Sequence, residues 1–410
     1  MLRLRIRSKS FALASTSVVS PPKEWQGIGT SFESCWFDRF DPCIRAVRIC
    51  VTSTVKWAGM GCIREVLVTQ PRSISLTRRR PIGSPLVAAG TSMARDHLLA
   101  LADRMKSQID FVEIDEHGAV LPEYAGKAPE AEMLWCHGRF AGSWVMSAID
   151  ALPGLDWVHS DFVGVDALTL GTFVQRSIVI TNGGNNFSRP MAEYIVLGML
   201  ASAKQFPFFV RNSDAGKWDT SRELSELEGA KLLLLGLGSV NSLVAKMCKG
   251  FGMDVVAWTR TEHSSLAEGV SRHVFGNEWL KEITDADYVV VGVPLTAHTR
   301  GLIDKAVLLE VAKPDLTLIN LARGAIIDQV GLLEALDSGR LRYVLLDAYL
   351  SEPLPPESPL WKRPNVTVLP HHSWSSPRVM ARSVELMGSQ LHRWLSDLPL
   401  LDPVDLSAGY

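Results

Sequence analysis

Short apolar runs alternate with amphipathic stretches from residue 85 onward. A helix is predicted over 94–105, because Leu98, Leu101 and Met105 recur at helical spacing on one face. Short apolar strands separated by helical stretches are typical of a parallel sheet with helices on its faces. Five runs of strand length occur in this part of the chain, at 86–90, 111–114, 133–136, 155–158 and 178–181.

A second alternating series follows a long helix that the pattern predicts over about 190–206. Six apolar runs of strand length come after residue 230, and six is the number of strands in a doubly wound dinucleotide-binding sheet. They lie at 231–235, 254–258, 288–293, 316–320, 343–346 and 366–369. The pattern therefore predicts an α/β protein with two domains joined by the long helix.

Residues 1–84 show no sustained helical or strand periodicity, and their charge balance differs from that of the rest of the chain. The segment 1–92 carries 14 Lys and Arg against 5 Asp and Glu, whereas the whole chain has a net charge of -2. We expect 1–84 to be a poorly ordered basic extension with one short strand at about 65–69. Its Arg- and Ser-rich start resembles an organellar transit peptide; the alternatives are an unstructured extension and a start codon placed too far upstream.

Composition excludes several classes of protein. With 47% hydrophobic and 21% charged residues, the chain is globular rather than disordered or fibrous. Its net charge argues against a protein that coats nucleic acid, and no uncharged apolar run reaches the ~18 residues that span a bilayer. We therefore expect neither a nucleic-acid nor a membrane partner.

The cysteines, like the excess of basic residues, are concentrated in the extension. Four lie in the extension and only Cys136 and Cys248 lie in the body, and no CxxC pair occurs. The spacing gives poor support for a zinc site or a disulfide framework, so no metal is expected and a reducing compartment is the default. The expected location is the cytoplasm, or a mitochondrion or other organelle if the extension is a transit peptide.

A glycine loop is the first chemical motif. In "LLLLGLGSVNSLVAK", Gly236 and Gly238 follow a strand and begin a helix. The first glycine permits a tight turn, and the second lets the backbone approach a pyrophosphate at the helix N-terminus, with Ser239 and Val240 beside it. Asn241 stands at the third glycine position, so we expect this helix to lie slightly farther from the strand.

The end of the next strand indicates which dinucleotide binds. NAD sites usually have Asp or Glu there, to accept hydrogen bonds from the ribose 2′-OH. This chain has Thr259 followed by Arg260. Because a guanidinium and a hydroxyl suit a 2′-phosphate and a carboxylate would repel it, we expect NADP(H) in preference to NAD(H).

Three later motifs place ionisable side chains at strand ends of the same domain. "NLARGAIID" presents Arg323, "LLDAYLSEPLPPESPLW" presents Asp347 and Glu352, and "NVTVLPHHSW" presents His371 and His372. Ligands of such sheets bind outside the carboxyl ends of the strands, so these side chains are expected to meet at one site.

Together these motifs resemble the D-isomer-specific 2-hydroxyacid dehydrogenase family, from about Pro85 to Tyr410. Thr259–Arg260 and the terminal "VDLSAGY" look more like its glyoxylate/hydroxypyruvate reductase branch. The landmarks that carry the resemblance are "LDWVHSDFVGVDAL", "ITNGGNNFSRPMAEY", "GLGSVN", "VPLTAHTRGLI", "NLARGAIID", "LDAYLSEPLPPESPLW" and "PHHSW".

The resemblance implies two Rossmann-like doubly wound parallel-sheet domains with a cleft between them that closes over substrate. The substrate domain would be 85–187 plus a returning C-terminal helix within 374–410, and the dinucleotide-binding domain 188–373. A homodimer joined through the cofactor domain is implied as well.

The resemblance also assigns roles. Arg323 would anchor the substrate carboxylate and polarise the carbonyl, His371 would be the general acid, and Glu352 would orient the imidazole. Asp347 would contact the nicotinamide carboxamide, and the loop 136–139 would add backbone N–H groups at Gly138. Cofactor contacts are also implied at Pro294 and Ala322.

The chain departs from the family pattern near this site. Phe187 stands where the family often has Asn, and His372 follows His371 where an apolar residue is usual. We assign the acid to His371, because it directly follows Pro370 as the family's catalytic histidine does. For Trp374, lining of the substrate pocket and ordinary packing remain equal alternatives.

The sequence thus predicts an NAD(P)H-dependent reductase that transfers a hydride between nicotinamide and a small 2-keto or 2-hydroxy acid, such as glyoxylate or hydroxypyruvate. The alternative is a non-enzymatic dinucleotide-sensing protein of the same fold that acts like a corepressor.

Overall fold

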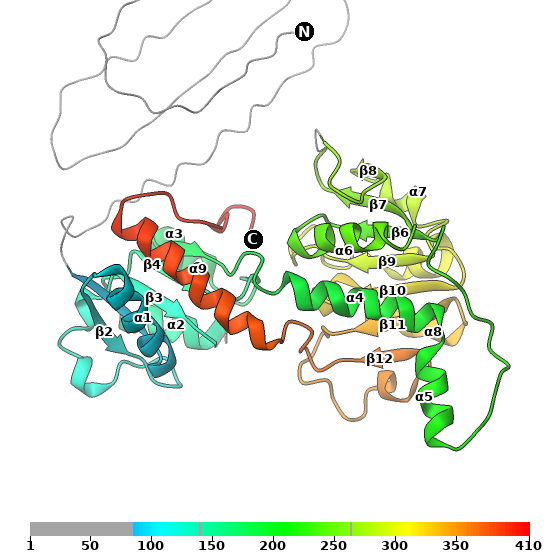
Figure 1. Ribbon diagram of the computed structural model, residues 1–410, viewed down its shortest axis with the longest axis horizontal. Coiled ribbons are helices and arrows are strands. Elements are labelled where there is room, and N and C mark those ends of the chain that lie inside the picture. Colours follow the sequence, from blue (N-terminus) through cyan, green and yellow to red (C-terminus); the bar gives the residue numbers. More distant parts are fainter. Residues whose placement is uncertain (1–84, 139–141, 263–264) are drawn as a thin grey trace, which may run out of the picture. The chain divides into compact units, whose positions relative to one another are not determined.

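A computed structural model describes residues 85–138, 142–262 and 265–410, which belong to one unit, Thr69–Tyr410. The predictions for 1–84, including the strand at 65–69, lie outside the described residues, as does Arg139. Two sheets, each with parallel strands throughout, organise this unit (Figure 1).

The first sheet has five strands in the order β2-β1-β3-β4-β5. Alternate residues of β1 supply different hydrophobic cores: Leu86 and Ala88 pack in one, Val87 and Ala89 in the other. A strand that is buried on both faces is largely apolar, which is why the sequence shows a continuous apolar run here. The strands are β1 Leu86–Gly90, β2 Ile109–Glu113, β3 Met133–Cys136, β4 Trp157–Ser160 and β5 Val179–Thr181.

Helices cover both faces of this sheet. One core holds α1 (Ser92–Met105) and α9 (Pro377–Leu395), and the Trp394 ring of α9 lies 5.3 Å from that of Trp157. The other core holds α2 (Gly142–Ala151) and α3 (Leu170–Arg176). The long C-terminal helix thus packs on the sheet formed at the start of the described chain, next to α1 in Figure 1.

The second sheet has seven strands in the order β12-β11-β10-β9-β6-β7-β8. We expected six, and the strand that the pattern missed is β8. It lies at the edge of the sheet, and only Val274 of its four residues is fully buried, so it has no continuous apolar run. The strands are β6 Lys231–Leu235, β7 Asp254–Thr259, β8 Arg272–Phe275, β9 Tyr288–Val291, β10 Leu316–Asn320, β11 Leu341–Leu346 and β12 Val366–Val368.

The long helix predicted at about 190–206 is confirmed as α4, which spans Ser188–Ala203. A separate helix, α5 (Phe206–Asp214), follows after Gln205, which has a left-handed backbone. The remaining helices of this sheet are α6 Ser239–Lys249, α7 Trp279–Glu282 and α8 Gln329–Asp337, with a π-helical turn over Val307–Val311.

The strand order fixes where a ligand can bind. The chain runs outward from β6 through β7 to β8, and then returns to β9 on the other side of β6. The loops after β6 and β9 therefore leave the sheet in opposite directions, which opens a crevice at the carboxyl ends of these strands. The predicted fold class, two parallel-sheet α/β domains, is confirmed.

Among the described residues, no helix is long and apolar enough to cross a membrane.

Candidate active site

A cavity of about 990 Å³ lies at the crevice of the second sheet. Its walls come from the loops that follow strands of that sheet, from residues 162–166 and 182–187 after strands of the first sheet, and from the start of α4. Among the residues assigned in the sequence analysis it is lined by Gly236, Gly238, Ser239, Val240, Thr259, Arg260, Pro294, Ala322, Arg323, Asp347 and His371.

The glycine loop has the geometry of a phosphate cradle. Gly236 has a φ of +92°, and a Cβ there would lie 2.6 Å from the carbonyl oxygen of Gly292. Gly238 precedes the first residue of α6, Ser239, so backbone N–H groups of that helix end face the cavity. A helix N-terminus with unobstructed N–H groups binds phosphate, so these residues fit a dinucleotide.

Asn241 is buried in the position where a third glycine is usual. Its Nδ2 donates a hydrogen bond of 2.8 Å to the carbonyl oxygen of Gly236. The amide packs against Gly292, where a Cβ would lie 2.3 Å from Nδ2. Gly292, directly after β9, thus leaves the space that a glycine at position 241 would otherwise leave. The larger Asn241 side chain stabilises the loop through its hydrogen bond.

At the end of β7, Thr259 and Arg260 have different partners. Thr259 Oγ1 lies 2.6 Å from the carbonyl oxygen of Thr261 and 2.6 Å from Nε2 of His273. Arg260 donates from Nη2 to the hydroxyl of Tyr410 at 3.0 Å, and its Cζ lies 5.8 Å from that ring's centroid. Tyr410 also lines the cavity, which the sequence pattern did not indicate.

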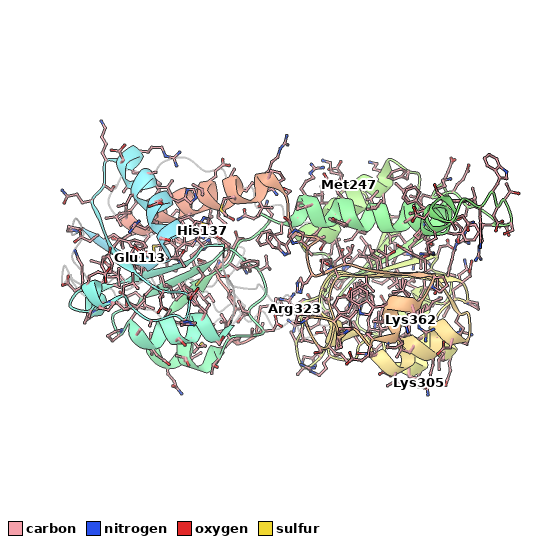
Figure 2. All side chains as sticks on the ribbon, turned by 90° about the horizontal axis from the view of Figure 1, so that it is seen from below. Glu113, His137, Met247, Lys305, Arg323 and Lys362 are labelled. Carbon is pink, nitrogen blue, oxygen red and sulfur yellow. The ribbon has the colours of Figure 1, made fainter. Side chains whose placement is uncertain are left out.

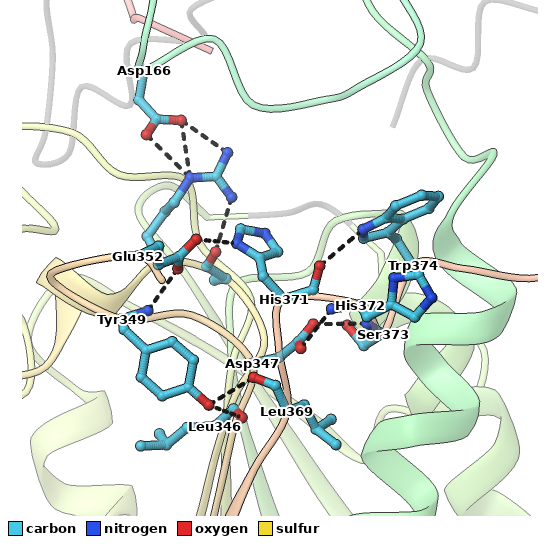
Figure 3. A network of polar contacts seen from close by, with 12 residues as sticks. Asp166, Leu346, Asp347, Tyr349, Glu352, Leu369, His371, His372, Ser373 and Trp374 are labelled. Carbon is cyan, nitrogen blue, oxygen red and sulfur yellow. Dashed lines mark hydrogen bonds and ion pairs between the residues drawn. The ribbon is translucent and has the colours of Figure 1, made fainter. Parts of the chain in front are cut away.

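Glu352 and His371 meet as a hydrogen-bonded pair (Figure 3). Nδ1 of His371 donates to Oε2 of Glu352 at 2.6 Å, and Oε1 of Glu352 accepts from the backbone N–H of Tyr349 at 2.8 Å. The imidazole is therefore held through Nδ1, which leaves Nε2 for a ligand in the cavity.

Asp347 shapes the loop that carries His371. Its buried carboxylate accepts the backbone N–H groups of His372 at 2.8 Å and of Ser373 at 2.9 Å. His371 itself has a φ of +52°, a left-handed conformation that a histidine adopts only where its surroundings impose it. These two hydrogen bonds and that between Trp374 Nε1 and the His371 carbonyl oxygen, at 3.0 Å, constrain the loop.

Tyr349 joins the ends of β11 and β12 beneath this loop. Its hydroxyl lies 2.8 Å from the carbonyl oxygens of both Leu346 and Leu369. Burial raises the pKa of the Tyr349 hydroxyl well above its ordinary value, so this group stays a neutral donor.

Arg323 already holds a carboxylate. Its Nε lies 3.0 and 3.1 Å from the two carboxylate oxygens of Asp166, Nη2 lies 2.9 Å from one of them, and Nη1 donates to the Ala322 carbonyl oxygen at 2.9 Å. At Gly164 a Cβ would lie 1.6 Å from Nη2, so only glycine admits the guanidinium there. Asp166 and Gly164 are 157 and 159 positions before Arg323, and no local pattern pairs them with it.

Gly138 does not line the cavity. Its N–H donates to Oδ2 of Asp161 at 3.0 Å, and the same oxygen lies 2.7 Å from Nδ1 of His137. His137 lies among the buried side chains of the first sheet, away from Arg323 (Figure 2). The structure therefore does not bring Gly138 together with the other assigned residues.

Three aromatic side chains form a wall of the cavity beside the His371 loop. The rings of Phe162, Phe187 and Trp374 lie 5.4 to 5.9 Å apart, centroid to centroid. All three line the cavity, so Trp374 both packs and lines it. The role of Phe162 was missed, because a single aromatic residue in a loop gives no periodic signal.

Comparison with known proteins identifies the family. The family model for the NAD-binding domain of D-isomer-specific 2-hydroxyacid dehydrogenases matches residues 196–373. Glyoxylate/hydroxypyruvate reductase B of Pectobacterium atrosepticum is 31% identical over 53% of this chain and 69% of its own length. The chain belongs to the D-isomer-specific 2-hydroxyacid dehydrogenase family, whose members are NAD(P)-dependent oxidoreductases that act on CH–OH groups.

Two further similarities bear on which branch of the family this chain resembles. D-3-phosphoglycerate dehydrogenase of Archaeoglobus fulgidus is 33% identical over 63% of this chain. The chain spans about half the length of that protein and of a second archaeal phosphoglycerate dehydrogenase. A D-isomer-specific 2-hydroxyacid dehydrogenase of Xanthobacter autotrophicus Py2, solved with NADPH and MES, matches 80% of this chain and all of its own, with 27% identity and a TM-score of 0.68.

Proposed function

We propose that this chain is an NADPH-dependent reductase of small 2-keto acids of the glyoxylate and hydroxypyruvate class. The observation that carries the proposal is a single cavity whose walls include the glycine loop, Arg323 and His371, with His371 bonded to Glu352. One end suits a dinucleotide, and the other suits an anionic substrate that accepts a proton.

Arg323 would bind the substrate carboxylate. A guanidinium has five N–H groups, of which three are used by Asp166 and Ala322. One N–H remains on each terminal nitrogen, and together they suit a bidentate contact with a carboxylate. Asp166 would hold the guanidinium in place while the free edge faces the substrate.

His371 would supply the proton. Glu352 accepts from Nδ1 and so fixes the ring, which leaves Nε2 to donate a proton to the carbonyl oxygen as it becomes an alkoxide. A nicotinamide dinucleotide held in this cavity would supply the hydride. Asp347 would contribute by keeping the 371–373 backbone fixed and by facing the nicotinamide end of the cavity.

The cofactor we propose is NADP(H) in preference to NAD(H). The two described carboxylates that line the cavity are Asp166, paired with Arg323, and Asp347, at the end of β11. The end of β7 carries Arg260 instead, and a cation there suits the 2′-phosphate. The similar Xanthobacter structure, which was solved with NADPH, supports this choice.

The substrate end favours a small keto acid without a second anionic group. Apart from Arg260 at the nucleotide end, Arg323 is the one Arg or Lys side chain among the described residues that line the cavity. It would be occupied by the keto-acid carboxylate, so no second described guanidinium or ammonium is left there for a phosphate ester. The aromatic wall of Phe162, Phe187 and Trp374 also argues against a phosphorylated substrate.

We also propose a homodimer joined through the cofactor domain. The α5 helix and the segment after it expose apolar side chains that a monomer would leave in water, Phe206 at 58% and Trp218 at 97% exposed. A cytoplasmic location remains our proposal; both described cysteines, Cys136 and Cys248, are free thiols, which suits a reducing compartment.

The test is steady-state oxidation of NADPH and of NADH by the full chain, with glyoxylate, hydroxypyruvate, pyruvate, phenylpyruvate and phosphohydroxypyruvate. We expect turnover of glyoxylate or hydroxypyruvate with NADPH preferred. Turnover confined to phosphohydroxypyruvate would contradict the substrate proposal, and cofactor binding without turnover of any keto acid would favour the dinucleotide-sensing alternative.

A further inference from the structure

The hydroxyl proton of Thr259 is already used in a hydrogen bond within the protein. Its oxygen lies 2.6 Å from the Thr261 carbonyl oxygen and 2.6 Å from Nε2 of His273. A hydroxyl has one proton, so it donates either to the carbonyl oxygen or to the imidazole. In either case no proton of Thr259 is left for a 2′-phosphate at the end of β7.

Tyr410 brings a second hydroxyl to the same place. It accepts a hydrogen bond of 3.0 Å from Nη2 of Arg260, and both side chains line the cavity together with Gly409. A phenol that accepts from a guanidinium keeps its own proton to donate. Arg260 and Tyr410 can therefore both donate to one anion.

The segment that carries Tyr410 is anchored on the first sheet. Val404 is buried, and its N–H donates to the Ile180 carbonyl oxygen at 2.9 Å, while Asn182 N–H donates to the Asp402 carbonyl oxygen at 3.2 Å. Pro403 forms an antiparallel bridge with Thr181, the last residue of β5. These contacts pack residues 402–404 against the edge of the first sheet, near the C-terminal label in Figure 1.

A closed turn then directs Tyr410 to the cavity. The Asp405 carbonyl oxygen accepts the N–H of Gly409 at 2.8 Å, and the Asp405 N–H donates to a main-chain oxygen of Tyr410 at 2.9 Å. The carboxylate of Asp405 also accepts the N–H of Ser407 at 3.0 Å. Gly409 has a φ of +80°, which a residue with a side chain rarely adopts. These hydrogen bonds hold the backbone that carries the phenol, and the contact with Arg260 holds its hydroxyl.

We propose that Tyr410 is a specificity-determining residue for the 2′-phosphate of NADP(H). Its hydroxyl accepts from Arg260 and donates to the phosphate, and so provides the second donor that Thr259 does not. This inference rests on the NADP(H) preference in the proposed function, and it extends that site to the end of the chain.

The test compares the Tyr410→Phe variant with the unmodified full chain. Dissociation constants are measured for NADPH and NADH, and for the fragments 2′,5′-ADP and 5′-AMP, by fluorescence titration. Loss of one hydrogen bond to a charged group should weaken NADPH and 2′,5′-ADP binding about tenfold. Binding of NADH and 5′-AMP should change less than about twofold, because these ligands lack the phosphate.

Two further variants complete the design. Tyr124→Phe makes the same chemical change in a residue that does not line the cavity, and we expect no effect on any of the four ligands. In a double-mutant cycle, Tyr410→Phe should cost much less NADPH affinity in an Arg260→Ala background, because the two side chains share one phosphate.

Three results would overturn the inference: unchanged NADPH binding in Tyr410→Phe, equal losses for NADPH and NADH, or no preference for 2′,5′-ADP over 5′-AMP in the unmodified chain. The reductase proposal fails separately, if no keto acid is turned over. Binding of the nucleotide fragments does not depend on turnover, so the two failures are distinguishable.

Discussion

At the scale of single residues, the site depends on side chains that are held in place before a substrate arrives. Glu352 fixes the ring of His371 through Nδ1, and Asp166 grips one edge of the Arg323 guanidinium. Arg323, Glu352 and His371 could be singled out from the sequence, because their motifs resemble those of the family, and their roles stay predictions. Asp166 could not be paired with Arg323 in this way, because their contact depends on how distant parts of the chain pack.

Arg323→Lys tests the carboxylate anchor. A lysine keeps the positive charge but cannot hold Asp166 and a substrate carboxylate at once with a planar fork. We expect kcat/KM for the keto acid to fall roughly 10²-fold, and roughly 10³-fold in Arg323→Ala. Steady-state kinetics measures both. An Arg323→Lys variant as active as the unmodified chain would contradict the bidentate anchor.

Glu352→Gln tests the orientation of the acid. The amide is nearly isosteric with the carboxylate but lacks the negative charge that strengthens the hydrogen bond from Nδ1 of His371. We expect kcat to fall about 10²-fold with a small change in KM, because the interaction matters when the proton moves. A loss confined to KM would show that Glu352 serves substrate binding instead.

At the scale of elements, the sequence predicted the described strands with one exception, β8. The β8 strand lies at the sheet edge and has one fully buried residue, so no apolar run in the sequence indicates it. At the glycine loop, the sequence led us to expect that Asn241 would hold α6 farther from the strand. In the structure its amide donates a hydrogen bond to the Gly236 carbonyl oxygen and packs against Gly292. The space at Gly292 belongs to a different strand end, which a local pattern does not reveal.

Gly292→Ala tests this packing of α6 on the glycine loop. The new methyl group would lie 2.3 Å from Nδ2 of Asn241, so the loop or the side chain must shift. We expect a loss of about 1–3 kcal/mol in the free energy of unfolding and weaker dinucleotide binding.

The double variant Asn241→Ala/Gly292→Ala provides the matched control. Removing the amide should restore much of the stability lost in Gly292→Ala, a coupling that urea unfolding measures. Additive losses in the double variant would show that the Asn241 amide is not what the methyl group meets.

At the scale of the whole molecule, two parallel sheets follow from two series of apolar runs, and the strand order places the cavity at the switch point between β6 and β9. The sequence predicted this architecture because buried parallel strands read as near-continuous apolar runs. The anchoring of 402–404 beside β5 was not predictable in the same way, since it rests on backbone hydrogen bonds.

Global stability should fall as the pH falls, through His159 on β4. Complete burial lowers the pKa of His159 to about 4, and its Nδ1 lies 2.8 Å from Thr181 Oγ1. The unfolded chain, with an ordinary histidine pKa of about 6.5, binds the proton more strongly, so stability is lost between about pH 6.5 and 4. From pH 7 to about pH 5 this residue should account for about 2 kcal/mol.

Urea unfolding of the His159→Asn variant checks this contribution. Asparagine can keep a hydrogen bond to Thr181 but does not titrate, so the variant should lose about 2 kcal/mol less than the unmodified chain between about pH 7 and 5. Equal losses in the two proteins would assign the acid sensitivity to other groups.

The central claim is that this cavity transfers a hydride to the carbonyl carbon of a 2-keto acid. The most direct measurement is one turnover of hydroxypyruvate with NADPH that carries deuterium at the transferring position of the nicotinamide, followed by mass spectrometry of the product. The account predicts a 2-hydroxy acid with deuterium at C2, formed in equal amount with NADP⁺ and lost in Arg323→Ala. NADPH that binds without transferring deuterium to any 2-keto acid would contradict it.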